Sequence, residues 1–204
     1  MNYQNKQLVD YLRAEGVLKT TALISAFYEI DRLDFVPPQY QSNAYGDFPV
    51  DIGFGQTISQ PTTVAFMLEL LELKAGNQVL DVGSGSGYTT AIIAKAVGAK
   101  GKVIGLDVIK DIVHFGRENI GKYKLKNAEI LLAEKGIVGM PGKEFDKILV
   151  SAAADALPKE LLVQLKNKGR LVIPIKDSVW LYEKDNQGKI FNRQFYGFAF
   201  VPLI

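Results

Sequence analysis

Hydrophobic positions recur at two different spacings along the chain, and the spacing changes near residue 77. Residues 4 to 30 carry apolar side chains three and four positions apart, which predicts two amphipathic helices. Residues 39 to 60 lack such a period, so we expect an irregular loop there. Pro61 opens the apolar run PTTVAFMLELLEL, which is typical of a helix with proline in its first turn.

From Asn77 onward, short apolar runs alternate with segments of helical period. We expect strands at QVLDV, KVIGLDV, AEILLA, FDKILVSAA and RLVIPI, separated by helices over 87–98, 110–123 and 157–169. The remaining segments, SVWLYEK and KIFNRQFYGFAFVPLI around the turn DNQG, predict an antiparallel hairpin. The pattern therefore predicts an α/β fold, with a doubly wound and mostly parallel sheet, an antiparallel C-terminal hairpin and an N-terminal helical extension.

Composition narrows the class of protein without naming a function. The 204 residues suit one domain, and 48% hydrophobic with 23% charged residues is typical of a globular protein. No apolar run approaches the roughly 20 residues of a membrane span, and the polar N-terminus lacks a signal-peptide core. The absence of cysteine agrees with a cytoplasmic protein and excludes sulfur-ligated metals. A net charge of +2 gives no reason to expect nucleic acid as a partner.

The segment VLDVGSGSGYTTAII carries the strongest motif in the chain. Gly83, Gly85 and Gly87 fall between a predicted strand and a predicted helix, where backbone amides and the helix dipole favour an anionic or strongly polar group. Asp107 ends the next strand, the position of an acid that accepts both hydroxyls of a ribose. This arrangement predicts a nucleoside site; the alternative is that the glycines only form a tight turn.

Asp81 indicates which nucleoside would bind. The order D-x-G-x-G-x-G differs from the G-x-G-x-x-G of dinucleotide sites, and a carboxylate at Asp81 would repel a pyrophosphate. A nicotinamide-dependent oxidoreductase is therefore disfavoured. S-adenosylmethionine offers an ammonium group for Asp81, a carboxylate for the loop amides and a ribose for Asp107. The alternative for Asp81 is a polar strand-end residue that caps the loop.

This motif resembles motif I of the class I S-adenosylmethionine-dependent methyltransferases, whose Rossmann-like seven-stranded sheet would include the C-terminal hairpin. The stretch GFGQTISQP, followed by MLELL, is similar to the signature of the protein-L-isoaspartate O-methyltransferase family. Further segments extend that resemblance over nearly the whole chain: DRLDFVPPQY, AYGDFPVDIGFGQTIS, FDKILVSAAADALPKELLVQLKNKGRLVIPI and FAFVPL.

The resemblance implies methyl transfer from S-adenosylmethionine to the α-carboxylate of L-isoaspartyl residues in aged proteins and peptides, after which the ester closes to a succinimide. Because a carboxylate is already ionised at neutral pH, such a reaction needs neither a general base nor a metal. We expect a single domain, with N-terminal helices and a substrate loop in residues 1–60 and a cofactor-binding core in 61–204. We also expect a monomer with no nucleic-acid or membrane partner.

The resemblance also assigns roles to individual residues. Ser59 would be the catalytic residue that positions the substrate carboxylate, with Thr57 beside it and Asp51 near the substrate backbone. The residues expected to bind the cofactor are Gly55, Gln56, Thr57, Asp81, Gly83, Ser84, Gly85, Gly87, Asp107 and Glu134. Two alternatives remain: Ser59 precedes Pro61 closely enough to cap a helix, and Asp51 could be a solvated loop acid.

The chain departs from the family pattern at the expected adenine end of the site. Many members carry Gly-Asp-Gly where this chain has Ala133, Glu134 and Lys135, so the acid is one methylene longer and both glycines are missing. This departure keeps the second of two further functions open. One is a methyltransferase of this fold with a small-molecule or RNA acceptor, and the other is a non-catalytic S-adenosylmethionine-binding homologue.

Overall fold

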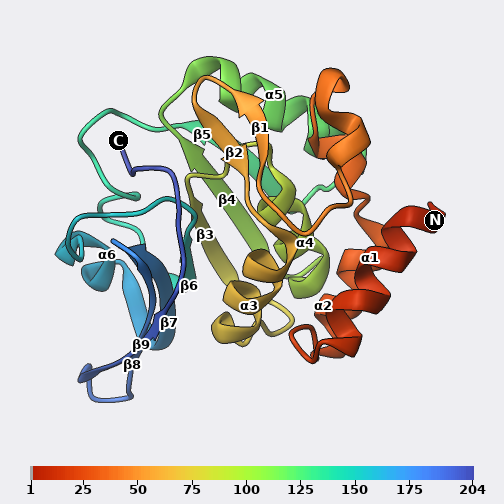
Figure 1. The fold of residues 1–204 in the computed structure, drawn as a ribbon. Helices are drawn as coiled ribbons and strands as arrows, with labels where there is room; N and C mark the ends of the chain where they lie inside the picture. Colours follow the sequence, from red (N-terminus) through yellow and green to blue (C-terminus); the bar gives the residue numbers. More distant parts are fainter. Residues whose placement is uncertain (1) are drawn as a thin grey trace.

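The computed structural model describes residues 2–204, which form a seven-stranded sheet covered by helices (Figure 1). The strand order is β5-β4-β3-β6-β7-β8-β9. Neighbouring strands from β5 to β7 run parallel, whereas β7-β8 and β8-β9 are antiparallel. The strands are β3 (Gln78–Val82), β4 (Lys102–Asp107), β5 (Ala128–Leu132), β6 (Phe145–Val150), β7 (Leu165–Ile175), β8 (Ser178–Lys184) and β9 (Ile190–Tyr196). The predicted fold class is confirmed.

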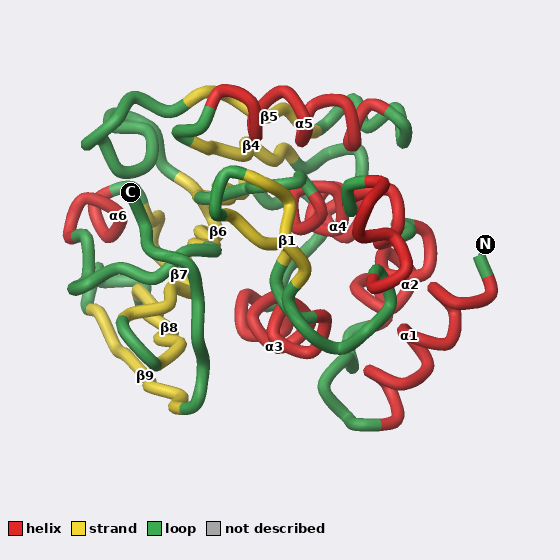
Figure 2. Tube along the Cα trace, turned by 45° about the horizontal axis from the view of Figure 1, so that its top comes forward, coloured by secondary structure: helices red, strands yellow, loops and turns green. Residues whose placement is uncertain are grey.

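Helices cover the two faces of the sheet unequally. The helices are α1 (Tyr3–Ala14), α2 (Thr21–Glu29), α3 (Pro61–Leu71), α4 (Tyr88–Val97), α5 (Lys110–Gly121) and α6 (Lys159–Val163). One buried cluster joins α1 to α5 with one face of the sheet, and a second joins α6 with the other. Figure 2 shows α6 beside β7 and β8, on the opposite side of the molecule from α1 and α2. No helix within residues 2–204 has the length and apolar character of a bilayer span.

The segment before α3 is more ordered than the sequence predicts. It contains the short 3-10 helices η1 (Arg32–Phe35) and η2 (Pro38–Asn43) and a two-stranded antiparallel sheet of β1 (Val50–Gly53) and β2 (Gln56–Ile58). The expectation of an irregular loop over 39–60 is therefore wrong. Gly53, Phe54 and Gly55 all have positive φ at the hairpin tip, which lets the chain reverse within three residues.

The helix predicted over 157–169 is also too long. Helix α6 ends at Val163, and β7 already begins at Leu165 and pairs with Phe145. Leu165 is completely buried against the second cluster, so sheet pairing and burial outweigh the helical period of this stretch. Gln164 fixes the change of direction, because its side-chain amide accepts the N–H of Met140 and donates to the carbonyl of Val138.

Candidate active site

The site lies where the chain reverses its direction of winding across the sheet. Strands β4 and β5 follow β3 on one side, and β6 and β7 continue on the other. In open α/β sheets, ligands bind at the carboxyl ends of the strands beside such a reversal. Two adjoining clefts open there, and both are lined by Gln56, Gly83, Asp107 and Ala152.

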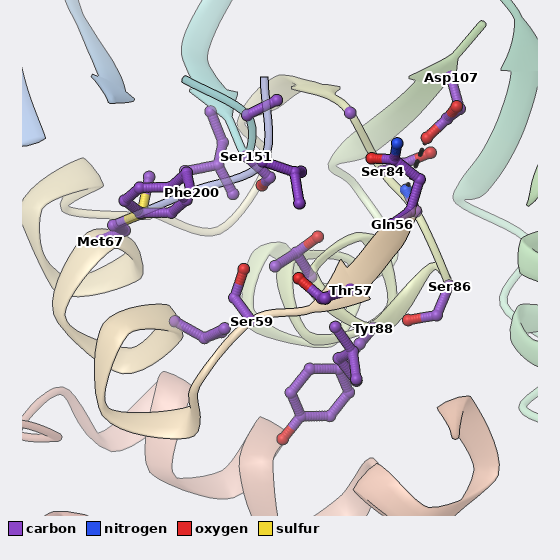
Figure 3. Close-up of a pocket in the computed structure, with 18 residues that line it drawn as sticks. Gln56, Thr57, Ser59, Met67, Ser84, Ser86, Tyr88, Asp107, Ser151 and Phe200 are labelled. Carbon is purple, nitrogen blue, oxygen red and sulfur yellow. Dashed lines mark hydrogen bonds between the residues drawn. The ribbon is translucent and has the colours of Figure 1, made fainter. Parts of the chain in front are cut away.

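The first of these, the inner cleft, holds about 630 Å³ of space, part of it open to solvent. The glycine loop forms one wall, and the β1–β2 hairpin and the residues that follow it form another (Figure 3). Val64 and Met67 of α3 add apolar surface, and Ser151 and Phe200 close the remaining side. The inner cleft therefore combines hydroxyl groups with apolar walls.

The second, the apolar cleft, holds about 750 Å³ and lies beside Asp107 and Gln56. It is lined largely by apolar side chains and glycines from three segments: 106–109, 136–139 and 202–204. A third hollow, the outer groove, holds about 1260 Å³ between the start of α3 and residues 197–201. Thr57, Ser59 and Ser151 line both the inner cleft and the outer groove, so these two spaces meet at three hydroxyl groups.

The glycine loop takes the expected conformation, with positive φ at Gly83, Gly85 and Gly87. Gly87 also allows close packing, because a Cβ there would lie 3.0 Å from the carbonyl oxygen of Gly116 in α5. Most of the loop amides are already engaged: those of Gly83 and Ser84 donate to the carbonyl of Leu106. The loop is thus held from within the protein, and Gly87 does not line either cleft.

An anionic group has better donors in the first turn of α4. The first amides of a helix have no acceptor inside it, and the helix dipole adds positive charge there. Tyr88 and Thr89 occupy this turn and line the inner cleft. The hydroxyl of Ser84, which also lines the inner cleft, is buried and has no hydrogen-bond partner among residues 2–204.

Asp81 lies behind the inner cleft and does not line it. Its Oδ2 accepts the hydroxyls of Thr89 at 2.7 Å and Thr90 at 2.6 Å, while Oδ1 has no partner among the described residues. Complete burial raises the pKa of this carboxyl to about 6. The strand-end alternative accounts for both hydroxyl contacts. Of the two threonines, only Thr89 lines the inner cleft, so Asp81 lies one residue behind it.

Asp107 ends β4, as predicted, and lines both clefts. Its carboxylate oxygens accept the N–H of Gly85 at 3.1 Å and the N–H of Ile109 at 3.0 Å. Burial raises the pKa of Asp107 above its ordinary value. The carboxylate is therefore fixed between the glycine loop and the start of α5, where a ribose between the two clefts could reach it.

The hairpin brings Gln56, Thr57 and Ser59 to the inner cleft. Figure 3 shows the hydroxyls of Thr57 and Ser59 facing the same space. Ser59 does not cap α3, whose N-cap is Gln60. Asp47 supplies the cap from the preceding loop, accepting the backbone N–H of Thr62 at 2.9 Å and its hydroxyl at 2.7 Å. The helix-capping alternative for Ser59 is not supported.

Three other expected site residues lie away from the clefts. Asp51 is exposed on β1, and its carboxylate accepts the N–H of Gly53 within the hairpin. Gly55 is exposed at the hairpin tip, and Glu134 is exposed in the loop after β5. None of the three lines the inner cleft, the apolar cleft or the outer groove.

Sequence reasoning missed the contribution of the C-terminal segment. Strand β9 ends at Tyr196, and Gly197, with φ of 93°, turns the chain back across the sheet. Residues 200–201 then line the inner cleft, and residues 202–204 line the apolar cleft. Backbone hydrogen bonds that Ala153 makes with Val201 and Leu203 hold this segment in place. Ser151 was also missed, although its position directly after β6, the neighbour of β3, was a usable signal.

Comparison with known proteins agrees with this arrangement. The family model "Protein-L-isoaspartate(D-aspartate) O-methyltransferase (PCMT)" matches residues 3–204. The chain is 40% identical to the protein-L-isoaspartate O-methyltransferase of Methanopyrus kandleri, over 98% of this chain and 90% of that protein. It is 41% identical to protein-L-isoaspartate O-methyltransferase 2 of Archaeoglobus fulgidus, over 100% and 94%.

A solved structure is similar over the same extent. The crystal structure described as a protein-L-isoaspartate O-methyltransferase from Plasmodium falciparum, in complex with S-adenosyl-L-homocysteine, has a TM-score of 0.86 and 31% identity. The similarity covers 100% of this chain and 99% of that chain. The site at the carboxyl ends of β3, β4 and β6 thus occurs in a chain that belongs to the protein-L-isoaspartate (D-aspartate) O-methyltransferase family.

Proposed function

We propose that this chain is a protein repair enzyme that transfers a methyl group from S-adenosylmethionine to the α-carboxylate of L-isoaspartyl residues in proteins and peptides. Membership of the family over residues 3–204 supports both the reaction and the donor. The structural observation that carries the proposal is the meeting of the inner cleft and the outer groove at Thr57, Ser59 and Ser151. A peptide in the outer groove can place its carboxylate there.

The residues around the two clefts fit S-adenosylmethionine. The carboxylate of Asp107 would accept hydrogen bonds from the ribose hydroxyls, and the amides in the first turn of α4 and the buried Ser84 hydroxyl would donate to the carboxylate at the methionine end. The adenine would fit the apolar cleft, whose lining includes Ile109 and Leu203. When bound, S-adenosylmethionine supplies a methyl group on a positively charged sulfur, which is a good leaving group. Gly55, Gly87 and Glu134 do not line either cleft, so the proposal gives them no contact with the cofactor.

Ser59 and Thr57 position the acceptor, with Ser59 as the catalytic residue. Their hydroxyls donate to a carboxylate that is already ionised at neutral pH, so orientation is the main requirement. Asp51, on the exposed edge of the hairpin, would contact only substrate backbone that extends beyond the outer groove.

The wider assignments are proposals as well. We propose that residues 1–204 work as one domain and as a monomer in the cytoplasm, on isoaspartyl proteins and not on nucleic acid or membranes. The shared walls of the clefts support the single domain, since they come from both the first 60 residues and the core. The small net charge and the absence of cysteine support the choice of partner and compartment. Light scattering during gel filtration tests the monomer.

One assay separates repair from the remaining alternatives. The protein is incubated with methyl-labelled S-adenosylmethionine and either an isoaspartyl peptide or the same peptide with normal aspartate. Base-labile label on the first peptide alone supports repair. If S-adenosylhomocysteine binds in calorimetry but neither peptide is labelled, the acceptor differs or the chain is non-catalytic. Equal labelling of both peptides contradicts the proposed substrate.

A further inference from the structure

Arg32 is completely buried in the N-terminal part of the chain, and it forms no ion pair among residues 2–204. Its Nε donates to the carbonyl oxygen of Ala44 at 2.8 Å, and one terminal nitrogen donates to that of Ile58 at 3.3 Å. The guanidinium carbon lies 5.3 Å from the ring centre of Tyr88. The other terminal nitrogen has no partner in the described part of the chain.

Burying a guanidinium in this way is unfavourable in itself. Transfer of a charge out of water is costly unless it is paired, and an apolar side chain of similar volume is often at least as stable. The cost is visible in the pKa of Arg32, which burial lowers to about 10, so that the group is still charged at neutral pH. Tyr88 and Asp47 offset only part of the effect of burial on this pKa, so packing alone does not account for a guanidinium at this position.

Two of the three residues that contact the guanidinium of Arg32, Ile58 and Tyr88, line the inner cleft. Ile58 ends β2 and directly precedes Ser59, so its carbonyl fixes the peptide unit that carries Ser59. Tyr88 is the first residue of α4, directly after the glycine loop, and lines the inner cleft. A single guanidinium therefore contacts both the segment that presents Ser59 and the helix start that faces the cofactor.

Asp47 holds the other side of Ser59. Its carboxylate accepts the side-chain amide of Gln60 at 3.1 Å in addition to its two contacts with Thr62. Ser59 thus lies between two anchored points, the carbonyl of Ile58 before it and the Asp47 contacts after it. Removing the first anchor would free the peptide unit before Ser59 while α3 stayed capped.

We propose that Arg32 is a positioning residue for methyl transfer. By holding the carbonyl of Ile58 against the start of α4, it sets the distance between the Ser59 hydroxyl and the cofactor side of the inner cleft. The inference rests on the proposed function for its effect on turnover. The contacts themselves exist whatever the acceptor is, so the anchoring can be measured separately.

The test compares Arg32→Met, Arg32→Lys and the control Arg170→Met. Arg170 also donates to a backbone carbonyl, that of Leu70 at 2.9 Å, and it pairs with Glu72 and Glu183. It faces Lys147 near the start of β6, at the end of the sheet away from the clefts. The control therefore removes a partly buried arginine anchor without touching Ser59.

For Arg32→Met we expect kcat on an isoaspartyl peptide to fall roughly 10- to 100-fold, because misplacement by about 1 Å carries a cost of this size. The dissociation constant of S-adenosylhomocysteine should stay within about three-fold, since the cofactor contacts remain. Arg32→Lys should recover part of kcat, because an ammonium can reach one of the two carbonyls but not both. Arg170→Met should lower the melting temperature with kcat nearly unchanged.

Hydrogen–deuterium exchange supplies a readout that does not depend on turnover. Peptides covering residues 50–60 should exchange faster in Arg32→Met than in wild type and not in Arg170→Met. If Arg32→Met does not fold, kcat and exchange are compared between Arg32→Lys, wild type and Arg170→Met instead. Unchanged kcat and exchange in a folded Arg32 variant would overturn the proposal, as would a loss of kcat no larger than in Arg170→Met. If the wild-type protein did not methylate the isoaspartyl peptide, but residues 50–60 still exchanged faster in Arg32→Met, the proposed function would be refuted. The anchoring role of Arg32 would then still stand.

Discussion

One carboxylate oxygen of Asp107 accepts the backbone N–H of Gly85 at 3.1 Å and so ties the end of β4 to the glycine loop. Replacing Asp107 by alanine should remove both this tie and the acceptor for the ribose. Hydrogen bonds to a charged group contribute about 1.5–3 kcal/mol, so we expect S-adenosylhomocysteine to bind roughly 10- to 100-fold more weakly. Calorimetry measures this, with the exposed Asp111→Ala as the matched control. Equal affinities in the two variants would contradict the role of Asp107.

The pKa of Asp81, near 6, should make cofactor affinity depend on pH. Above this pH the carboxylate is ionised and favours the ammonium group of the cofactor from behind Thr89. We expect S-adenosylhomocysteine to bind more weakly as pH falls from 7 to 5, and this dependence should be smaller in Asp81→Asn. Titrations at pH 5, 6 and 7 provide the measurement. Parallel curves for wild type and variant would show that Asp81 is only structural.

The same carboxyl should also affect stability. The folded protein binds the proton of Asp81 more tightly than the unfolded chain, whose pKa is near 3.8. The contribution of Asp81 to the free energy of unfolding should therefore fall as pH rises from about 4 to about 6, by an amount on the order of 3 kcal/mol. Urea titrations of wild type and Asp81→Asn isolate this contribution. A difference between the two proteins that is constant with pH would contradict the raised pKa.

Ser59→Ala should lower kcat on an isoaspartyl peptide roughly 10-fold or more, because one donor to the substrate carboxylate is lost. The affinity for S-adenosylhomocysteine should stay within a few-fold, and the melting temperature should hardly change, since Asp47 caps α3. Ser42→Ala, at an exposed position of η2, is the control. An unchanged kcat in Ser59→Ala would show that Ser59 does not position the substrate carboxylate.

At the adenine end of the site, we expect replacement of Glu134 to have little effect on cofactor affinity and replacement of Ile109 to have a clear one. Glu134 is exposed and does not line the apolar cleft, so Glu134→Gln should change the affinity for S-adenosylhomocysteine by less than about two-fold. Ile109 lines the apolar cleft, and Ile109→Ala should weaken binding several-fold through lost apolar contact. A large effect of Glu134→Gln would indicate that the loop after β5 moves onto the adenine.

Much of the architecture could be predicted from local patterns. Strand β3, the glycine loop and α4 follow from a short apolar run, three glycines and a helical period, so the position of Asp107 could be deduced before the fold was known. The end of α6 could not, because the period of 157–169 is helical while the burial of Leu165 in the sheet depends on distant residues. Local preference is weak compared with burial against a sheet.

The candidate site, like the fold, could be predicted from the sequence only in part. Ser59 could be identified because its segment resembles the signature of a known family, but the alternative of a helix cap was excluded only by the contact between Asp47 and the start of α3. Likewise, Glu134 occupies an expected position in the sequence, yet its side chain is exposed. Sequence spacing does not determine which way a loop side chain points.

The sequence by itself determined the class of fold, the glycine loop, the acid at the end of β4 and the hydroxyl segment before α3, because each depends on neighbours within a few residues. Only the tertiary structure decided that residues 200–204 close both clefts, that Asp81 lies behind Thr89, and that Arg32 connects Ile58 to Tyr88. Those contacts join segments far apart in the chain, and burial and hydrogen bonding in the folded protein select them.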